Sequence, residues 1–499
     1  MSFIPSPQQA AFFHWAKTGS GSCVLEAVAG AGKSTTLLHS VSLFSGQVAL
    51  LAYNKKIADE LKEKLAKAGH DWKKAQAGTT HSFGFSAYRK AVPSVKVDDD
   101  KVSKIFDATI FEASPLFQYR SKILQLVSLA KQSGIGFLVR MDSDAWYDLV
   151  DHHDLAASDE DEYFPVDEVV RTARTILTRS NDLAGVVDFD DMIYLPLLKR
   201  VRFWQFDVVM IDEAQDTNET RRALVRALVR KGGRVVAVGD RHQAIYGFTG
   251  ADNDSLDRIK RDFNAVEMPL TTTYRCPKSV VTFAKQWVGH IEAHSSAPEG
   301  SVSSILLDDF LQTPGLGADD VVLSRTTKPL VALALRLIRG GVACRVEGRD
   351  IAENLKKLAQ RWKLKNLDKL EERLVEYGEK QRTALLAKKQ ESKMAVLEDT
   401  IDTLVVLIQA CRAEQQYAVS DLVARIDSLF ADGNAKVLTL MTIHKSKGSE
   451  YSRVYWLDRA GTCPSKWARQ QWQQDQEINL CYVAATRAKD QLIEIIVPR

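Results

Sequence analysis

A turn of small residues that ends in a lysine and a hydroxyl is the clearest chemical signal in this 499-residue chain. Residues 27–34 read AVAGAGKS and lie between an apolar run at 23–26 and a helical pattern. This is a P-loop with alanine in place of its usual first glycine, and its backbone N–H groups can surround phosphate oxygens at a helix N-terminus. We expect Lys33 to reach the β- and γ-phosphates and the Ser34 hydroxyl to bind Mg²⁺. The predicted nucleotide-binding residues of this loop are Ala29, Gly30, Ala31, Gly32, Lys33, Ser34 and Thr35.

A P-loop needs an acidic partner at the end of a neighbouring strand. The apolar run FDVVMI at 206–211 leads directly to Asp212 and Glu213. We expect Asp212 to hold the hydration shell of Mg²⁺ and Glu213 to polarise the attacking water as a general base. These parts predict an enzyme that hydrolyses a nucleoside triphosphate with Mg²⁺. Kinases and GTPases share them, but no guanine-reading Asn-Lys-x-Asp follows, which argues against a GTPase.

The elements that must position these residues are short apolar runs alternating with helical patterns, which is typical of parallel α/β sheets. Near-continuous apolar strands indicate burial on both faces. Such runs lie at 23–26, 48–51, 208–211, 235–238, 321–323, 437–440 and 454–457. Two stretches lack them and are predicted to be mostly helical. The predicted organisation is a first α/β lobe (1–90 and 182–270) with a helical insertion (91–181), and a second lobe (271–350 and 434–499) with a smaller helical insertion (351–433).

Composition restricts the class of protein. A hydrophobic fraction of 45% and a charged fraction of 26% are ordinary for a globular protein. The net charge of +3 leaves any nucleic-acid binding to a local groove. The scattered cysteines include no CxxC pair, and no apolar run approaches the roughly 20 residues that span a bilayer. We therefore expect a soluble intracellular monomer, cytoplasmic or in a host cell if viral, without a membrane partner.

Several blocks resemble the ordered motifs of superfamily 1 helicases of the UvrD/Rep type. The segment VGDRHQAIYGFTGA at 238–251 resembles the third motif of that family. LMTIHKSKGSEY at 440–451 resembles the fifth motif, and LCYVAATRA at 480–488 resembles the sixth. TYR at 273–275 is similar to the fourth motif, DFDDM at 188–192 to a short motif ahead of the acidic strand, and Gln8 stands where the adenine-reading glutamine belongs. YNKKIA at 53–58 and TTHSF at 79–83 resemble the F-box DNA helicase branch most. The resemblance extends over nearly the whole chain and implies two RecA-like motor domains.

The resemblance also implies roles around ATP. Gln8 would read the adenine edge, Tyr274 would stack on the base and Glu450 would bind the ribose. Gln243 would sense the γ-phosphate. Arg275 and Arg487, both from the second lobe, would act as arginine fingers on the developing charge. Hydrolysis would then require the two lobes to close on ATP, which couples chemistry to a domain motion.

A motor on a single strand needs sequence-blind contacts, namely aromatic faces for bases and hydroxyl or N–H groups for phosphates. In the resembling motifs Phe248, flanked by Tyr246, would stack on a base. Hydroxyls and imidazoles would contact phosphates. The predicted DNA-binding residues are Tyr53, Asn54, Thr79, His81, Tyr246, Phe248, Thr442 and His444.

The resemblance implies an ATP-dependent DNA helicase that moves 3′→5′ on single-stranded DNA and acts at single-strand/duplex junctions, in repair, replication or recombination. The short second insertion, without a Gly-Ile-Gly hairpin, keeps open a translocase that strips bound proteins with little unwinding. A P-loop enzyme that ignores nucleic acid, such as a small-molecule kinase, is a further alternative. A non-catalytic scaffold is disfavoured by the intact set Lys33, Asp212, Glu213, Gln243, Arg275 and Arg487.

Overall fold

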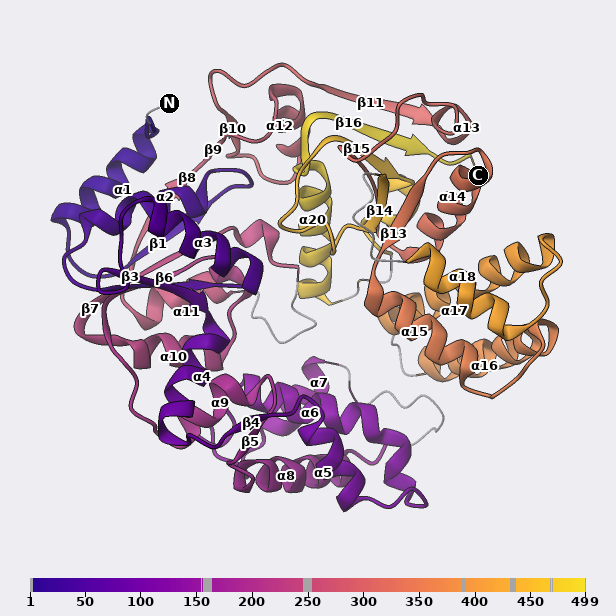
Figure 1. The fold of residues 1–499 in the computed structure, drawn as a ribbon, viewed down its shortest axis with the longest axis horizontal. Helices are drawn as coiled ribbons and strands as arrows, with labels where there is room; N and C mark the ends of the chain where they lie inside the picture. Colours follow the sequence, from indigo (N-terminus) through magenta and orange to yellow (C-terminus); the bar gives the residue numbers. More distant parts are fainter. Residues whose placement is uncertain are drawn as a thin grey trace. The chain divides into compact units, whose positions relative to one another are not determined.

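The computed structural model describes residues 3–153, 155, 164–245, 254–387, 391–430, 437–466, 468 and 470–498. These residues divide into two compact units, one ending at Thr271 and the other beginning at Thr272 (Figure 1). None of the described helices has the length and apolar composition that a membrane crossing requires.

The first unit is built on a parallel sheet that, in the described residues, has the strand order β3-β2-β6-β7-β1-β8. The bounds are β1 Cys23–Ala27, β2 Val48–Ala52, β3 Ala75–Thr79, β6 Phe206–Ile211, β7 Val229–Gly239 and β8 Val266–Leu270. Every residue of β2 is buried because strands and helices cover it on all sides. The parallel α/β fold expected from the apolar runs is confirmed, although both edge strands, β3 and β8, are too polar to have been recognised.

Helices connect these strands on both faces of the sheet. Their bounds are α1 Pro7–Thr18, α2 Lys33–Ser40, α3 Lys55–Lys67, α4 Thr80–Ala91, α10 Glu219–Leu228 and α11 Ser255–Asp262, with short 3₁₀ turns η1 Val41–Leu43, η3 Ala214–Asp216 and η4 Arg241–Gln243. Helix α1 starts where it does because Ser6 and Gln9 form a reciprocal capping box and Pro7 takes the first helical position.

A second group of helices in this unit surrounds a core of its own, visible beside the sheet in Figure 1. It comprises η2 Pro115–Tyr119, α5 Lys101–Thr109, α6 Arg120–Gln132, α7 Ala145–His152, α8 Val166–Asp182 and α9 Asp191–Leu198. The stretch 91–181, predicted to be mostly helical, also contains a short strand. The two-residue strand β4 (Lys96–Val97) pairs with β5 (Val186–Val187), a ladder too short to give a sequence signal.

The second unit contains another parallel sheet, with the order β11-β16-β15-β12-β14-β13 among its described residues. Its strands are β11 Ser301–Leu306, β12 Asp320–Ser324, β13 Cys344–Glu347, β14 Leu438–Thr442, β15 Tyr451–Leu457 and β16 Ala488–Ile496; β9 Thr272–Thr273 pairs separately with β10 Glu292–Ala293. The flanking helices are α12 Lys278–Ala284, α13 Leu307–Phe310, α14 Thr327–Arg339, α19 Arg459–Thr462 and α20 Gln471–Ala485.

The remaining helices of this unit, α15 Arg349–Gln360, α16 Leu367–Ala387, α17 Glu391–Ala413 and α18 Val419–Leu429, gather beside the sheet (Figure 1). On α16 the leucines at helical spacing, Leu367, Leu370 and Leu374, are fully buried in one core with α14, α17 and α18. The amphipathic pattern therefore packs this helix on its neighbours.

Candidate functional site

The P-loop joins β1 to α2 in a conformation that suits an anion. Gly30 and Gly32 have φ angles of 71° and 75°, in the left-handed region that glycine adopts without strain. Gly32 is the N-cap of α2, whose first N–H groups have no acceptor within the helix. Ala29 and Ala31 are buried, so their small side chains allow the loop to close tightly. Thr35, in the first turn of α2, is exposed.

A glutamine that the sequence patterns did not single out anchors the helix behind the loop. The buried amide of Gln9 donates from Nε2 to Thr36 Oγ1 at 2.9 Å, and the Thr36 hydroxyl in turn donates to the Gly32 carbonyl at 2.9 Å. Helix α1 is therefore fastened to the P-loop by buried hydrogen bonds. The capping signature of residues 6–9 could have indicated this position, but not its partner.

Because the strands are parallel, their carboxyl ends share one edge of the sheet, and the acidic residues after β6 meet the P-loop there. The Ser34 hydroxyl donates to Asp212 Oδ2 at 2.7 Å, and Lys33 Nζ lies 3.5 Å from Glu213 Oε1. Burial raises the pKa of Asp212 to about 6, with a further contribution from the Glu213 carboxylate, while Lys33 and the Ser34 hydrogen bond act in the opposite direction. The structure thus brings four predicted catalytic and metal-binding residues together.

This pair of oxygen donors fits Mg²⁺. The ion usually binds one or two protein oxygens and completes its octahedron with phosphate and water oxygens. Ser34 and Asp212 offer a hydroxyl and a buried carboxylate at adjacent positions. A cation bound there would offset the free-energy cost of burying the carboxylate charge. Ser34 and Asp212 are the residues that would hold it.

Gln215, which the motifs did not assign, links the acidic turn to the segment after β7. Its Nε2 donates to Glu213 Oε2 at 2.6 Å, and its Oε1 accepts from the Asp240 backbone N–H at 3.0 Å. Gln243 donates from Nε2 to Asp240 Oδ2 at 2.7 Å. A Cβ at Gly239 would lie 2.6 Å from Gln215 Oε1, so a larger residue there would displace this amide from its hydrogen bonds. The predicted base and the predicted γ-phosphate sensor are therefore linked through two buried residues, Gln215 and Asp240.

Gln8 lies on α1 with both ends of its amide engaged. Its Nε2 donates to Thr271 Oγ1 at 2.8 Å, and its Oε1 accepts from the Thr271 N–H at 2.7 Å. The amide is thus held against the segment that follows β8. Its assignment to the adenine edge stays a prediction.

In the second unit, residues assigned to the nucleotide lie close together although they are far apart in sequence. Arg275 donates from Nε to Glu450 Oε2 at 2.7 Å and from Nη1 to the Thr486 carbonyl at 3.4 Å. Arg487 is 1% exposed and donates to the carbonyls of Val483 (3.0 Å) and Ser449 (3.2 Å). Arg275 therefore forms an ion pair with Glu450 at the surface of the unit, whereas Arg487 is buried and held by backbone carbonyls.

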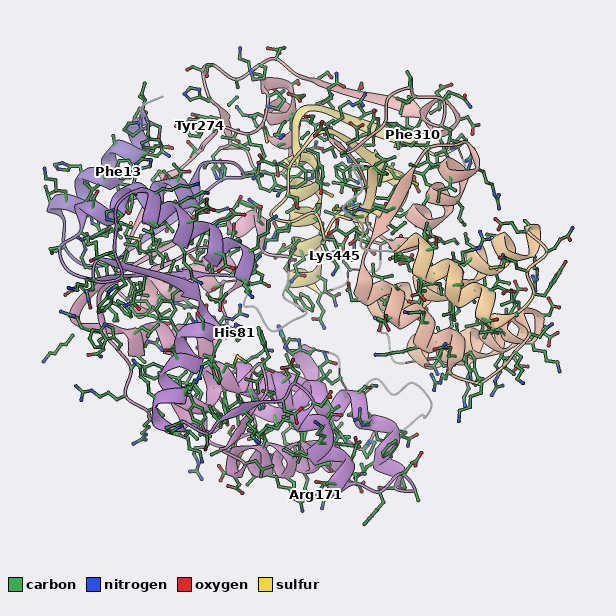
Figure 2. All side chains as sticks on the ribbon, in the orientation of Figure 1. Phe13, His81, Arg171, Tyr274, Phe310 and Lys445 are labelled. Carbon is green, nitrogen blue, oxygen red and sulfur yellow. The ribbon has the colours of Figure 1, made fainter. Side chains whose placement is uncertain are left out.

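Tyr274 (Figure 2), the residue predicted to stack on the base, is 43% exposed and directly precedes Arg275 in sequence. Its ring centroid lies 4.8 Å from that of His294, at an interplanar angle of 33°. An exposed ring of this kind can offer its surface to a planar ligand.

Two of the predicted nucleic-acid contacts of the first unit, Thr79 and His81, lie at the start of α4. Thr79 caps the helix by accepting from the Ser82 N–H at 3.1 Å. His81 (Figure 2) is 7% exposed and stacks on Phe189, with ring centroids 3.9 Å apart. Burial, and secondly Arg221, lowers the pKa of His81 to about 3, so its imidazole is neutral at physiological pH.

Phe189 belongs to the DFDDM block, but no role was assigned to it. Its side chain is 56% exposed, although one face of the ring is covered by His81. A large aromatic side chain held at the surface by a stacking contact is a candidate for stacking on a base. Only its spatial proximity to His81, across 108 residues of sequence, reveals this.

Tyr53 and Asn54 precede α3 and are already engaged within the unit. The Arg221 guanidinium lies 5.5 Å from the Tyr53 ring centroid, which occupies one face of the ring. Asn54 caps α3 by accepting from the Ile57 N–H at 2.9 Å. Tyr53 is also half-buried, whereas Phe189 is 56% exposed, so Tyr53 offers less surface to a ligand.

The corresponding residues of the second unit, Thr442 and His444, lie at the end of β14 and just after it. Thr442 is half-buried at the end of the strand, and its carbonyl accepts from the Ser446 N–H at 3.2 Å. His444 is also half-buried, and burial, then Arg325 and Lys447, lowers its pKa to about 3. Two other predicted DNA contacts, Tyr246 and Phe248, lie outside the described residues.

Comparison with known proteins agrees with these motifs. Residues 7–264 match the family model of the UvrD/REP helicase N-terminal domain, and residues 251–498 match that of the UvrD-like helicase C-terminal domain. The chain is 26% identical over 299 residues to the ATP-dependent DNA helicase PcrA of Leuconostoc citreum, an alignment covering 55% of this chain and 38% of PcrA.

Two further relatives have the same identity of 26%. A probable DNA helicase II homolog of Mycoplasma pneumoniae aligns over 305 residues, 57% of this chain and 42% of the relative. DNA helicase II of Haemophilus influenzae aligns over 196 residues, 34% of this chain and 27% of the relative. The alignments thus span less than half the length of these relatives. Because the N-terminal family model alone matches more than half of the residues, and both units are parallel α/β structures of the RecA-like type, the chain belongs to the UvrD/REP helicase family.

Proposed function

We propose that this chain is an ATP-dependent DNA helicase that translocates 3′→5′ on single-stranded DNA and uses ATP hydrolysis to separate strands. The observation that carries the proposal is the meeting of Lys33 and Ser34 with Glu213 and Asp212 at one sheet edge, in a chain of this family. Relatives that bear the name ATP-dependent DNA helicase support it.

The nucleotide would bind by its phosphates at the P-loop. Lys33 donates to the β- and γ-phosphates, while Ser34 and Asp212 hold Mg²⁺, which neutralises phosphate charge when bound. Glu213 orients and polarises the attacking water, and Gln215 fixes the direction of that carboxylate. Gln243 senses the γ-phosphate. Gln8 and Tyr274 contact the adenine, and Glu450 contacts the ribose.

Arg275 and Arg487 are proposed to stabilise the charge that develops on the transferred phosphoryl group. Both belong to the second unit, whereas the P-loop belongs to the first. Hydrolysis therefore requires both units, and a change in either one affects turnover. This dependence is how ATP chemistry would drive movement.

DNA would be held without reading its sequence. Phe189 supplies an exposed aromatic face beside His81. The His81 imidazole is neutral, so it contacts a phosphate through an N–H hydrogen bond and not through an ion pair. Thr79, Tyr53 and Asn54 would add contacts in the first unit. The proposed track also includes Tyr246 and Phe248, and in the second unit Thr442 and His444.

The alternative is a translocase that strips proteins from single strands with little unwinding. The small size of the α15–α18 helical group favours it. Two assays separate the alternatives. One follows strand displacement from partial duplexes with a 3′ or a 5′ overhang, and the other follows release of streptavidin from biotinylated single strands.

We expect the 3′-tailed duplex to be unwound and the 5′-tailed duplex to remain intact, with Lys33→Ala inactive on both. Streptavidin release without unwinding would favour the alternative. Unwinding only of the 5′-tailed substrate would contradict the proposed direction. ATP-independent strand separation by the Lys33→Ala variant would contradict the proposed coupling.

A further inference from the structure

A buried cluster of charged side chains lies within the helical group of the first unit. Lys131 Nζ lies 2.5 Å from Asp188 Oδ2 and 2.7 Å from Asp191 Oδ1, and Lys101 Nζ lies 2.7 Å from Asp191 Oδ2. The two lysines come from α5 and α6, and the two aspartates from the DFDDM block. Two lysines pair with two aspartates where unpaired charges are costly, and the adjacent Asp190, whose pKa is raised by burial, accepts a hydrogen bond from the Ser128 hydroxyl of α6.

The cluster determines where Phe189 stands. The Asp191 N–H donates to Asp188 Oδ1 at 2.8 Å and the Asp188 N–H to Asp191 Oδ2 at 3.3 Å, so the segment between them forms a closed turn. Phe189 lies in this turn and stacks on His81. Helices α4 and α9 also pack closely at this turn. A Cβ at Gly84 of α4 would lie only 2.3 Å from the Met192 carbonyl oxygen of α9.

The backbone carbonyl of Lys131 contacts helix α10. The Thr220 hydroxyl, 3% exposed, donates to the Lys131 carbonyl at 2.6 Å. Thr220 lies in the first turn of α10, which follows η3 and therefore the acidic turn at Asp212. The next residue, Arg221, donates from Nη1 to the Asp216 carbonyl at 3.0 Å and lies over Tyr53.

We infer that Thr220 is a positioning residue that couples the acidic turn to the Phe189–His81 stack through Lys131. The contact is buried, and its acceptor belongs to a residue whose ammonium is fixed by two aspartates. A shift of the first turn of α10 therefore displaces α6 and, through the charge cluster, the turn that carries Phe189. The inference rests on the proposed function, since it describes how DNA binding accelerates ATP hydrolysis and how nucleotide alters DNA affinity.

The test compares Thr220→Val, which keeps the shape and removes the donor, with Thr220→Ser, which keeps the donor. Thr172→Val is the matched control, because the buried Thr172 hydroxyl donates to the Glu168 carbonyl at 2.7 Å within α8 alone. ATP turnover is measured with and without a single-stranded oligonucleotide. Oligonucleotide affinity is measured with and without a non-hydrolysable ATP analogue.

We expect Thr220→Val to keep its DNA-independent turnover and to lose about fivefold of its DNA stimulation, the factor that corresponds to a net hydrogen bond of about 1 kcal/mol. The ATP analogue is also expected to change oligonucleotide affinity less in Thr220→Val than in the wild type, and because coupling between binding sites is reciprocal, the oligonucleotide changes the affinity for the analogue by the same reduced factor. Thr220→Ser and Thr172→Val behave as wild type.

Full stimulation of Thr220→Val, or an equal loss in Thr172→Val, would overturn the inference while leaving the proposed function intact. A loss that Thr220→Ser does not restore would also overturn it, because the hydroxyl would not be the coupling group. A wild-type protein without any DNA stimulation would instead contradict the proposed function, and the inference with it.

Discussion

Gln215 donates from Nε2 to Glu213 Oε2 at 2.6 Å, while its Oε1 accepts from the Asp240 N–H at 3.0 Å. The residue proposed as general base is thus fixed by a side chain that also holds the segment carrying Gln243. Glu213 itself has a φ of 53°, uncommon for a residue with a side chain. The hydrogen bond from Gln215 fixes the orientation of the Glu213 carboxylate.

Replacing Gln215 by methionine keeps the volume and removes both hydrogen bonds. We expect kcat for ATP to fall about 10- to 100-fold, as for the loss of a hydrogen bond to a charged group worth about 1.5–3 kcal/mol, with little change in nucleotide affinity. Steady-state turnover and titration with a fluorescent ATP analogue measure the two quantities. Gln381→Met, at another buried glutamine, is the control. A weakened affinity with unchanged kcat would show that Gln215 does not position the base.

The two arginines assigned to the γ-phosphate should differ when each is changed to alanine. Arg275→Ala is expected to lower kcat by about 10³-fold or more, as for the loss of an arginine finger, and to leave the Tm nearly unchanged because its ion pair with Glu450 lies at the surface.

Arg487→Ala is expected to lower both kcat and the Tm, since its buried guanidinium donates to the Val483 and Ser449 carbonyls. Differential scanning calorimetry and ATP turnover measure both effects. An equal loss of Tm in the two variants would contradict this distinction.

Phe189→Ala is expected to weaken single-stranded DNA binding by about 1–3 kcal/mol, the range measured for loss of one base–aromatic stacking contact. Fluorescence anisotropy with a labelled oligonucleotide measures it. Phe111→Ala removes a phenylalanine of the same unit that is still more exposed, and it should bind as wild type. Equal affinity of the Phe189→Ala variant and the wild type would remove Phe189 from the DNA track.

Acid should destabilise the first unit through His81. The folded state holds the pKa of His81 at about 3, below the usual value of 6.5, so between these values the unfolded chain binds a proton that the folded chain excludes. The contribution of His81 to the free energy of unfolding is therefore fully present above pH 6.5. As the pH falls from 6.5 towards 3, this contribution decreases by about 1.4 kcal/mol per pH unit.

His81→Gln removes this contribution, so its free energy of unfolding should fall less steeply between pH 6 and 4 than that of the wild type. Urea unfolding at several pH values measures the slope. His14→Gln, at an exposed histidine, is the control. Parallel pH dependence in the wild type and His81→Gln would contradict the buried neutral imidazole.

The sequence predicts the buried strands well because central parallel strands are nearly continuous apolar runs, as in VALLA at β2. It misses β3, whose AQAGT is small and polar, and β8, which contains Pro269. The P-loop and the acidic turn can be recognised in the sequence because each directly follows an apolar strand. Gln215 and Phe189 are not, because their significance lies in contacts with Asp240 and His81 that depend on the folded chain.

The central claim is that nucleic acid controls ATP hydrolysis in this chain. The most direct measurement is steady-state ATP turnover with Mg²⁺, with and without a single-stranded oligonucleotide, for the wild type and for Lys33→Ala. We predict strong stimulation of the wild type by the oligonucleotide and no turnover by Lys33→Ala in either condition. Equal turnover by the wild type with and without the oligonucleotide would contradict the account.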